Sequence, residues 1–198
     1  MATRPDTPTA PTLRRDAQRN LERLEAAAIE VFYERGLGSP LEEIANRAGV
    51  SIGTLYNRFG SREQVIDAVV PTVVAAKLDA VATDALAGGT PWERFARYLD
   101  GLFALQASDP ILSDVLERAH ELNVERLIQL CAATLTTAGQ LIQAAQADGT
   151  LRPDFTVEDL AAELIANAGV IKSQATSEEA WRRHLALLLA GLRTSAPR

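Results

Sequence analysis

The sequence predicts an all-α protein, and three observations support this fold class. Apolar residues recur at spacings of three and four along most of the chain, with Ala and Leu dominant. Helix-start signals, each a capping side chain followed by proline or acidic residues, repeat at short intervals. β-branched residues do not alternate with polar ones, so no segment has the pattern of a strand.

The first long helix is expected over residues 14–35. It carries an apolar stripe that ends at Phe32, and Gly36 supplies the positive-φ stop behind it. Residues 1–12 are rich in Thr and Pro and have almost no large apolar side chains, so they are expected to form a disordered tail.

Further helices follow from capping signals such as Ser39-Pro-Leu-Glu42 and Thr90-Pro-Trp-Glu93. They are expected over residues 40–48, 52–59, 62–86, 91–107, 110–121, 123–147, 157–171 and 178–193. Pro71 should kink or split the helix that contains it, because proline removes a hydrogen bond and clashes one turn back. The expected first domain covers residues 13–60 and extends into the helix from 62, and the second covers 61–198.

Composition limits the function classes. The chain has 20 basic and 26 acidic side chains, a formal net charge of −6, whereas its first 66 residues hold nine of each. An acidic chain binds polyanions poorly in general, so nucleic-acid binding would need a local face in the neutral N-terminal third. One Cys and two His exclude a disulfide framework and the usual four-ligand zinc site. Cys131 is expected to be a small buried hydrophobe.

The same survey argues against membrane proteins and enzymes. The chain has no run of 18 apolar residues and no apolar leader, which predicts a cytoplasmic protein with no membrane partner. It also lacks the usual nucleophile, metal and phosphate-loop motifs, so we expect neither catalysis nor a cofactor nor a metal.

Residues 39–60 hold the most specific pattern, two short helices separated by Ala48-Gly49-Val50-Ser51. Gly49 fits a sharp positive-φ turn, and Ser51 can cap the second helix by accepting from a free backbone N–H. Each helix has one apolar, inward side. Its members are Leu41, Ile44, Ala45 and Ala48 in the first helix and Val50, Leu55 and Phe59 in the second. This is the arrangement of a helix-turn-helix motif, in which the second helix is presented to the DNA major groove.

The outward side of that second helix suits DNA. It carries hydroxyl, phenol, amide and guanidinium groups, which hydrogen-bond phosphates and base edges. Gly53 lets a phosphate or base edge come close to the backbone. Arg47 and Arg62 flank the helix as candidate phosphate ligands.

The stretch from about Arg19 to Val70 resembles the DNA-binding domain of TetR-family transcriptional regulators. The resemblance rests on the first helix with Phe32 and Gly36, on the run IANRAGVSIGTLYNRF, and on Ser61-Arg62-Glu63 behind it. Arg62 stands where lysine is commonest in the family, which keeps the charge. The resemblance covers roughly a quarter of the chain, and it implies a variable helical C-terminal domain that binds a small ligand and dimerises.

Carried onto this sequence, the resemblance implies that Tyr56 and Arg62 hold phosphates and that the start of the second helix lies nearest the bases. The predicted DNA contacts are Arg47, Ser51, Ile52, Gly53, Thr54, Tyr56, Asn57, Arg58 and Arg62. Alternatively, the Tyr56 ring packs on the domain core with its hydroxyl exposed to solvent, and Asn57 and Arg58 belong to a solvent-exposed surface without a DNA contact.

In the second domain, aromatic and apolar residues recur at helical spacing from Trp92 onward. Such a stripe is either core or the lining of the effector pocket that the resemblance implies. The candidate lining residues are Trp92, Phe95, Tyr98, Leu102, Phe103, His120, Asn123 and Leu127. His120 is explained at least as well as a surface residue.

The last two expected helices carry more apolar residues than two terminal helices can bury alone. The excess predicts a homodimer through a four-helix contact. The expected interface residues are Leu160, Leu164, Ala168, Trp181, Leu185, Leu188 and Leu192. The alternative is that these side chains cap the core of their own chain.

Together these observations predict a dimeric DNA-binding transcriptional regulator, a repressor that a small-molecule effector releases from its double-stranded operator. The alternative function is a helical ligand-binding or partner-binding module that does not use its DNA-binding motif.

Overall fold

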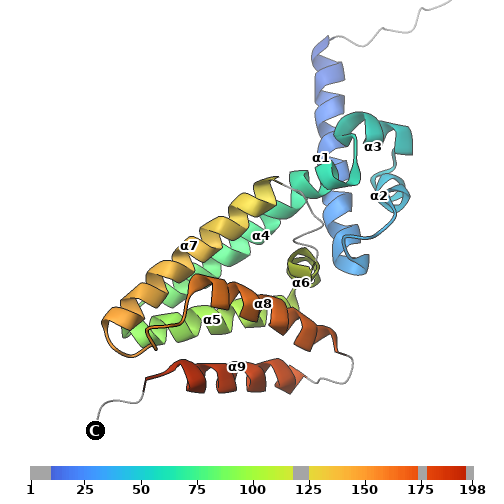
Figure 1. Ribbon diagram of the computed structural model, residues 1–198. Helices are drawn as coiled ribbons and strands as arrows, with labels where there is room; N and C mark the ends of the chain where they lie inside the picture. Colours follow the sequence, from blue (N-terminus) through green and yellow to red (C-terminus); the bar gives the residue numbers. More distant parts are fainter. Residues whose placement is uncertain (1–9, 118–124, 174–177, 195–198) are drawn as a thin grey trace, which may run out of the picture. The chain divides into compact units, whose positions relative to one another are not determined.

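The computed structural model describes residues 10–117, 125–173 and 178–194, and over these ranges the chain is helical (Figure 1). The helices are α1 (Ala10–Arg35), α2 (Leu41–Ala48), α3 (Ile52–Phe59), α4 (Arg62–Leu86), α5 (Pro91–Ser108), α6 (Pro110–Glu117), α7 (Glu125–Ala147), α8 (Val157–Lys172) and α9 (Glu178–Leu192). The predicted all-α class is confirmed. In these ranges the extended pairing amounts to one isolated bridge, between Leu151 and Arg193.

One local expectation was wrong. Helix α1 begins at Ala10, so the last part of the expected tail is helical; Pro11 is tolerated there because the first turn of a helix needs no backbone donor. Residues 1–9 lie outside the described part. Helix α4 continues through Pro71, so the proline does not split it, and the expected kink stays a prediction. The buried Val69, Val70 and Val74 beside the proline offset the hydrogen bond that it removes.

The chain divides into two compact units, Met1–Val69 and Val70–Arg198, which meet inside α4. In the first unit α1 packs on α2, and α2 on α3 (Figure 1). The centre of this unit is a set of fully buried side chains. It comprises Leu24, Ala28, Val31, Phe32, Ile44, Leu55, Val65 and Ile66.

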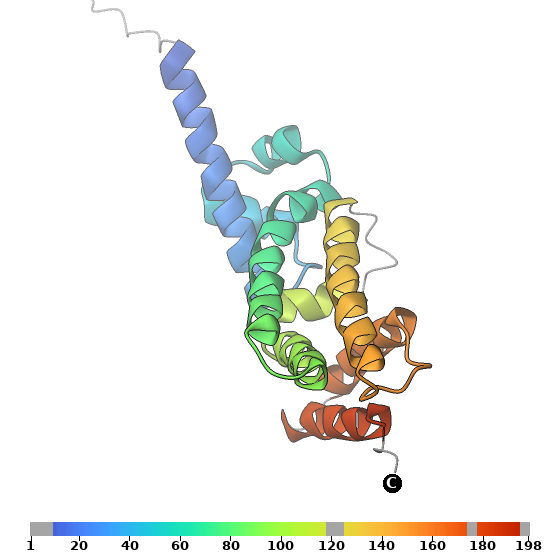
Figure 2. The ribbon, with the colours of Figure 1, turned by 90° about the vertical axis from the view of Figure 1, so that its left-hand side faces the viewer.

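In the second unit α5 is the central helix, and α6, α7, α8 and α9 all pack on it (Figure 2). Two of its helices start with reciprocal capping boxes, as their sequences predict. Thr90 N donates to Glu93 Oε2 over 2.8 Å at the start of α5, and Thr156 N donates to Asp159 Oδ2 over 2.9 Å at the start of α8. No helix in the described ranges is long and apolar enough to cross a membrane.

Candidate nucleic-acid interface

The turn between α2 and α3 has the geometry that its glycine predicts. Gly49 has φ 68°, a left-handed conformation that side chains with a Cβ rarely adopt. The turn is closed by two backbone hydrogen bonds, from Gly49 N to Asn46 O at 3.1 Å and from Val50 N to Ala45 O at 3.0 Å. These bonds fix the direction in which α3 leaves α2.

The start of α3 is held by its predicted cap. Thr54 N donates to Ser51 Oγ over 3.1 Å, and the two hydroxyl oxygens lie 2.9 Å apart. Leu55 is completely buried and anchors the helix to the core of the first unit. The cap and the anchor together determine which side of α3 faces outward.

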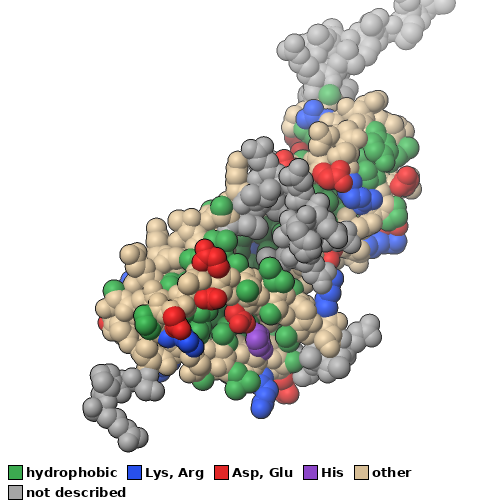
Figure 3. All heavy atoms as spheres, viewed as in Figure 1, with side chains coloured by type: hydrophobic (Ala, Val, Ile, Leu, Met, Phe, Trp, Pro, Cys, Tyr) green, Lys and Arg blue, Asp and Glu red, His purple; other side chains and the backbone are tan. Residues whose placement is uncertain are grey.

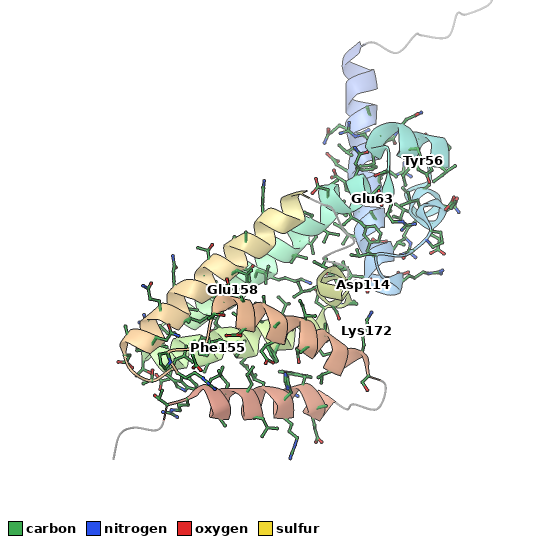
Figure 4. The ribbon with its side chains drawn as sticks, in the orientation of Figure 1. Tyr56, Glu63, Asp114, Phe155, Glu158 and Lys172 are labelled. Atoms are coloured by element: carbon green, nitrogen blue, oxygen red, sulfur yellow. The ribbon has the colours of Figure 1, made fainter. Side chains whose placement is uncertain are left out.

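The outward side of α3 is polar and open. Thr54, Asn57 and Arg58 are exposed, and Tyr56 is 47% exposed (Figure 4). Ile52 is half-buried, whereas Ser51 and Gly53 are exposed at the start of the helix. Within one eight-residue helix this surface offers hydroxyl, phenol, amide and guanidinium groups, which are the groups that bind phosphates and base edges.

Arg47 forms ion pairs with glutamates of its own unit. Its guanidinium forms a two-pronged ion pair with Glu34, with N···O distances of 2.7 and 2.6 Å, and Glu30 lies 3.7 Å away. The hydrogen bond from Arg47 lowers the pKa of the Glu34 carboxyl below its ordinary value. In the structure α1 thus supplies carboxylate partners for Arg47, which the local sequence pattern does not reveal, and its role as a phosphate ligand stays a prediction.

Arg62 also has partners within its own unit. Its Nη1 atom donates to Leu37 O over 3.0 Å and to Ser39 O. These bonds tie the start of α4 to the turn between α1 and α2, so the side chain has a structural role that the sequence did not reveal. Its role as a phosphate ligand stays a prediction.

Among the arginines of this unit whose side chains the structure describes, from residue 17 onward, three have no hydrogen-bond or ion-pair partner: Arg19, Arg23 and Arg58. Arg23 lies against the turn before α3, because a Cβ built on Gly49 would come within 2.6 Å of Arg23 Nη2. Sequence reasoning missed it, since Arg23 is on α1 and no local motif links it to the helix-turn-helix.

Two family models match the chain. The model for bacterial regulatory proteins of the tetR family matches residues 24–69, and the model for the C-terminal domain of SbtR-like transcriptional regulators matches residues 90–194. The chain belongs to the TetR family. It is a DNA-binding transcriptional regulator with a C-terminal ligand-binding domain.

Individual relatives agree with this assignment. The HTH-type transcriptional repressor KstR2 of Mycolicibacterium smegmatis is 26% identical over an alignment of 204 positions, gaps included, that covers 96% of each chain. A TetR transcription regulatory protein from Mycobacterium vanbaalenii is 32% identical, with 92% of this chain and 99% of that chain covered and a TM-score of 0.53. FadR from Bacillus subtilis, solved with stearoyl-CoA, shares the fold at 20% identity, 87% and 99% coverage and a TM-score of 0.64.

In this TetR-family regulator the predicted pocket residues of α5 are packed in the core of the second unit. Trp92, Phe95, Tyr98, Leu102 and Phe103 are all buried there. The Tyr98 hydroxyl donates to Thr134 O over 3.0 Å, and burial raises the pKa of Tyr98 to about 12. His120 and Asn123 lie outside the described residues, as does the side chain of Leu127. A pocket-lining role for these residues stays a prediction.

The predicted dimer residues lie on the inner side of α8 and α9. Leu160, Leu164, Ala168, Trp181, Leu185 and Leu192 are buried within their own chain, where α5 packs on both helices and α7 packs on α8. Their role in a dimer interface stays a prediction. Leu188 is half-buried, and it lines a surface cavity of about 510 Å³ beside α8 and α9.

Proposed function

We propose that this regulator is a dimeric repressor that binds a near-palindromic operator through α3 of each copy. A small-molecule effector that binds in the second unit is proposed to release it from the operator. One observation carries the proposal, namely the exposed polar side of α3 over the buried anchor Leu55. In a dimer, two such helices one DNA turn apart would sit about 34–36 Å from each other. A DNA-bound repressor acts where the DNA is, so we propose a cytoplasmic location.

The proposed contacts to DNA follow from exposure and free donors. Thr54 and Asn57 are placed nearest the bases, together with the backbone around Ser51 and Gly53. Tyr56 is placed on a phosphate, because its ring is half-exposed and its hydroxyl can donate. The remaining proposed phosphate ligands are Arg23, Arg58 and Arg62, and Ile52 is proposed to make apolar contact.

Binding to the DNA upstream of its own coding region tests the contact surface. Asn57→Ala should lower the affinity for the preferred DNA sequence by about tenfold, since one good base contact discriminates against a wrong base by roughly 1–3 kcal/mol. Asn46→Ala is the matched control, because Asn46 is an exposed asparagine on the neighbouring α2. Fluorescence anisotropy at fixed salt measures both variants. Equal affinity for wild type and Asn57→Ala would show that α3 does not read the bases.

We infer that the homodimer forms through the outer sides of α8 and α9. Ile165 on α8 is 57% exposed and Leu187 on α9 is 63% exposed, although both are large and apolar. Figure 3 shows hydrophobic side chains among charged ones over these two helices. The residues around them are small, since Ala162, Ala166, Ala186 and Ala190 are all exposed alanines. Small residues allow helices of a second copy to approach closely.

Light scattering on Ile165→Asp tests this face. A charge buried at the centre of the proposed contact should turn the dimer into a monomer at micromolar concentration. Leu86→Asp is the control, because Leu86 is 51% exposed at the end of α4 and lies outside the proposed face. A dimer that persists in Ile165→Asp, or that is lost equally in Leu86→Asp, would contradict this assignment.

The effector is proposed to act by linkage. FadR of Bacillus subtilis was solved with stearoyl-CoA, which has a long acyl chain and supports an effector with a sizeable apolar part here. An effector that prefers the DNA-free form must weaken operator binding, and operator must weaken effector binding by the same factor, typically about 5–150-fold. Titrations of each ligand in the presence of the other measure both factors.

A further inference from the structure

The second unit buries a small set of polar side chains inside an apolar core. Gln106 on α5, Asp109 at its end, Ser113 on α6 and Asn167 on α8 are all buried. The three helices that carry them pack on one another. Buried polar groups are costly unless each donor and acceptor has a partner, so every hydrogen-bonding atom in this cluster needs an explanation.

Two buried amides form a chain of hydrogen bonds whose direction is fixed. Gln106 Nε2 donates to the backbone oxygen of Leu164 over 2.9 Å. A carbonyl oxygen only accepts, so the Gln106 amide must place its nitrogen there and its oxygen on the other side. Asn167 Nδ2 then donates to Gln106 Oε1 over 2.9 Å. The orientation of Asn167 follows from that of Gln106 and is not a free choice.

This chain leaves one acceptor without a partner. Asn167 Oδ1 is buried and has no hydrogen bond within the described residues, and the whole of Asn167 is 0% exposed. Rotating the Asn167 amide by 180° would place its Oδ1 against Gln106 Oε1, and two acceptors cannot form a hydrogen bond. A flip of the amide therefore does not give Oδ1 a partner. The group that completes this site must therefore be a hydrogen-bond donor.

Apolar core residues lie one helical turn before each of the two amides. Leu102 and Phe103 precede Gln106 by one helical turn on α5, and Leu164 precedes Asn167 by one turn on α8. All three belong to the buried core of the unit. A completing molecule would therefore bring an apolar body together with its donor.

We propose that Asn167 Oδ1 is the recognition atom for the effector, and that the effector is an apolar molecule with a hydroxyl or amide N–H donor. This inference rests on the proposed function, in which the second unit binds a small molecule. It also excludes classes of ligand. A ketone, an ether or an ionised carboxylate has only acceptors and would set oxygen against oxygen at this atom.

The probes that test the inference are 1-octanol and 4-ethylphenol, each paired with its methyl ether. The ether keeps the apolar body and loses the donor. Isothermal titration of the full-length protein should show each alcohol binding about tenfold more tightly than its ether, the effect of one buried hydrogen bond left unmade. Equal affinity within both pairs, or no binding of either alcohol, would overturn the proposal, with water as the donor at this atom.

Two variants identify the atom responsible. Asn167→Leu removes Oδ1 and frees Gln106 Oε1, so it exchanges one unpaired buried acceptor for another and should melt close to wild type. The double variant Gln106→Leu/Asn167→Leu removes both acceptors, and in it the ratio between alcohol and ether should fall to about one. Asn46→Leu, on α2 of the other unit, should keep the wild-type ratio. A preference for alcohols that survives in the double variant would show that another group recognises them.

Two further measurements keep the result unambiguous. If Asn167→Leu is poorly folded, a crystal structure of the wild type with 4-ethylphenol decides, since the phenol oxygen must lie within hydrogen-bond distance of Asn167 Oδ1. A phenol bound elsewhere overturns the proposal. DNA binding without ligand is measured in parallel. Intact DNA binding without alcohol preference defeats only this inference, whereas a wild type that binds no DNA defeats the proposed function.

Discussion

Replacing Gly53 by alanine should make this regulator more stable and a weaker DNA binder. Gly53 is the second residue of α3 and has ordinary helical backbone, so the fold does not require a glycine there. A Cβ at this position would meet only Ser51 Oγ, at 3.7 Å, which is a normal van der Waals distance. The added methyl group therefore fits the protein and points into the space where DNA is proposed to bind.

The two effects have different sizes and opposite signs. Alanine is more favourable than glycine in a helix by about 0.5–1 kcal/mol, chiefly because glycine loses more backbone entropy on folding. A gain of that size should raise the melting temperature by about 2 °C. On the DNA side, a methyl group between the backbone of α3 and a phosphate or base edge should cost at least one contact, or about tenfold in Kd.

Thermal melting and anisotropy with the operator measure these effects on one preparation. Gly101→Ala is the matched control, because Gly101 is also helical but its Cβ would come within 2.7 Å of Val81 on α4. That variant should melt lower than wild type and bind DNA normally while folded. A Gly53→Ala protein with unchanged DNA affinity would refute the idea that DNA approaches the backbone of α3 closely.

Three other predictions concern single side chains. Arg23→Gln should make the slope of log K for DNA binding against log salt concentration shallower by about 0.9, the effect of one lost phosphate contact. Arg35→Gln is the control, because Arg35 is paired with Glu43 and its loss should leave the slope unchanged. Equal slopes for Arg23→Gln and wild type in salt-dependent binding titrations would contradict the role of Arg23. The pKa of Tyr98 is raised to about 12 by burial, whereas an unfolded tyrosine titrates near pH 10. The stability that comes from burying neutral Tyr98 is fully present below pH 10. Above pH 10 the tyrosine of the unfolded chain ionises first, so the free energy of unfolding should fall by about 1.4 kcal/mol per pH unit up to pH 12. Tyr98→Phe should lack this loss in alkaline denaturant melts, and identical pH profiles would contradict the assignment. Lys77→Met should lower the free energy of unfolding by about 1–3 kcal/mol, because it removes the ion pair to the buried Asp109; urea titration measures the change, and none is expected in Lys77→Arg.

Most of the fold was predictable because its signals are local. The caps at Ser51, Thr90 and Thr156 each use a side chain and a backbone group three residues apart. The turn at Gly49 needs only one residue with positive φ. Such features form in the same way wherever the segment is placed, so spacing and residue type sufficed to locate α2, α3, α5 and α8 to within a residue or two.

The functional residues were harder to predict because their partners are distant in sequence. The pairing of Arg47 with Glu34 spans 13 residues, and the bond from Arg62 to Leu37 spans 25. Nothing in the local pattern distinguishes a paired arginine from a free one. The dimer residues are hard to predict for a similar reason, since counting apolar residues on α8 and α9 does not show which of them α5 covers.

The distribution of paired and free charges explains how an acidic protein can still bind DNA selectively. Arg35 and Arg47 are neutralised by Glu43 and Glu34 on the same unit, so they add little to a general attraction for polyanions. Among the arginines of this unit whose side chains are described, Arg19, Arg23 and Arg58 have no partner. Binding that depends on few phosphate contacts has a shallow salt dependence and weak non-specific affinity. If the proposed base contacts of α3 are made, we expect them to supply a large share of the affinity, which would favour discrimination between sequences over tight binding to any DNA.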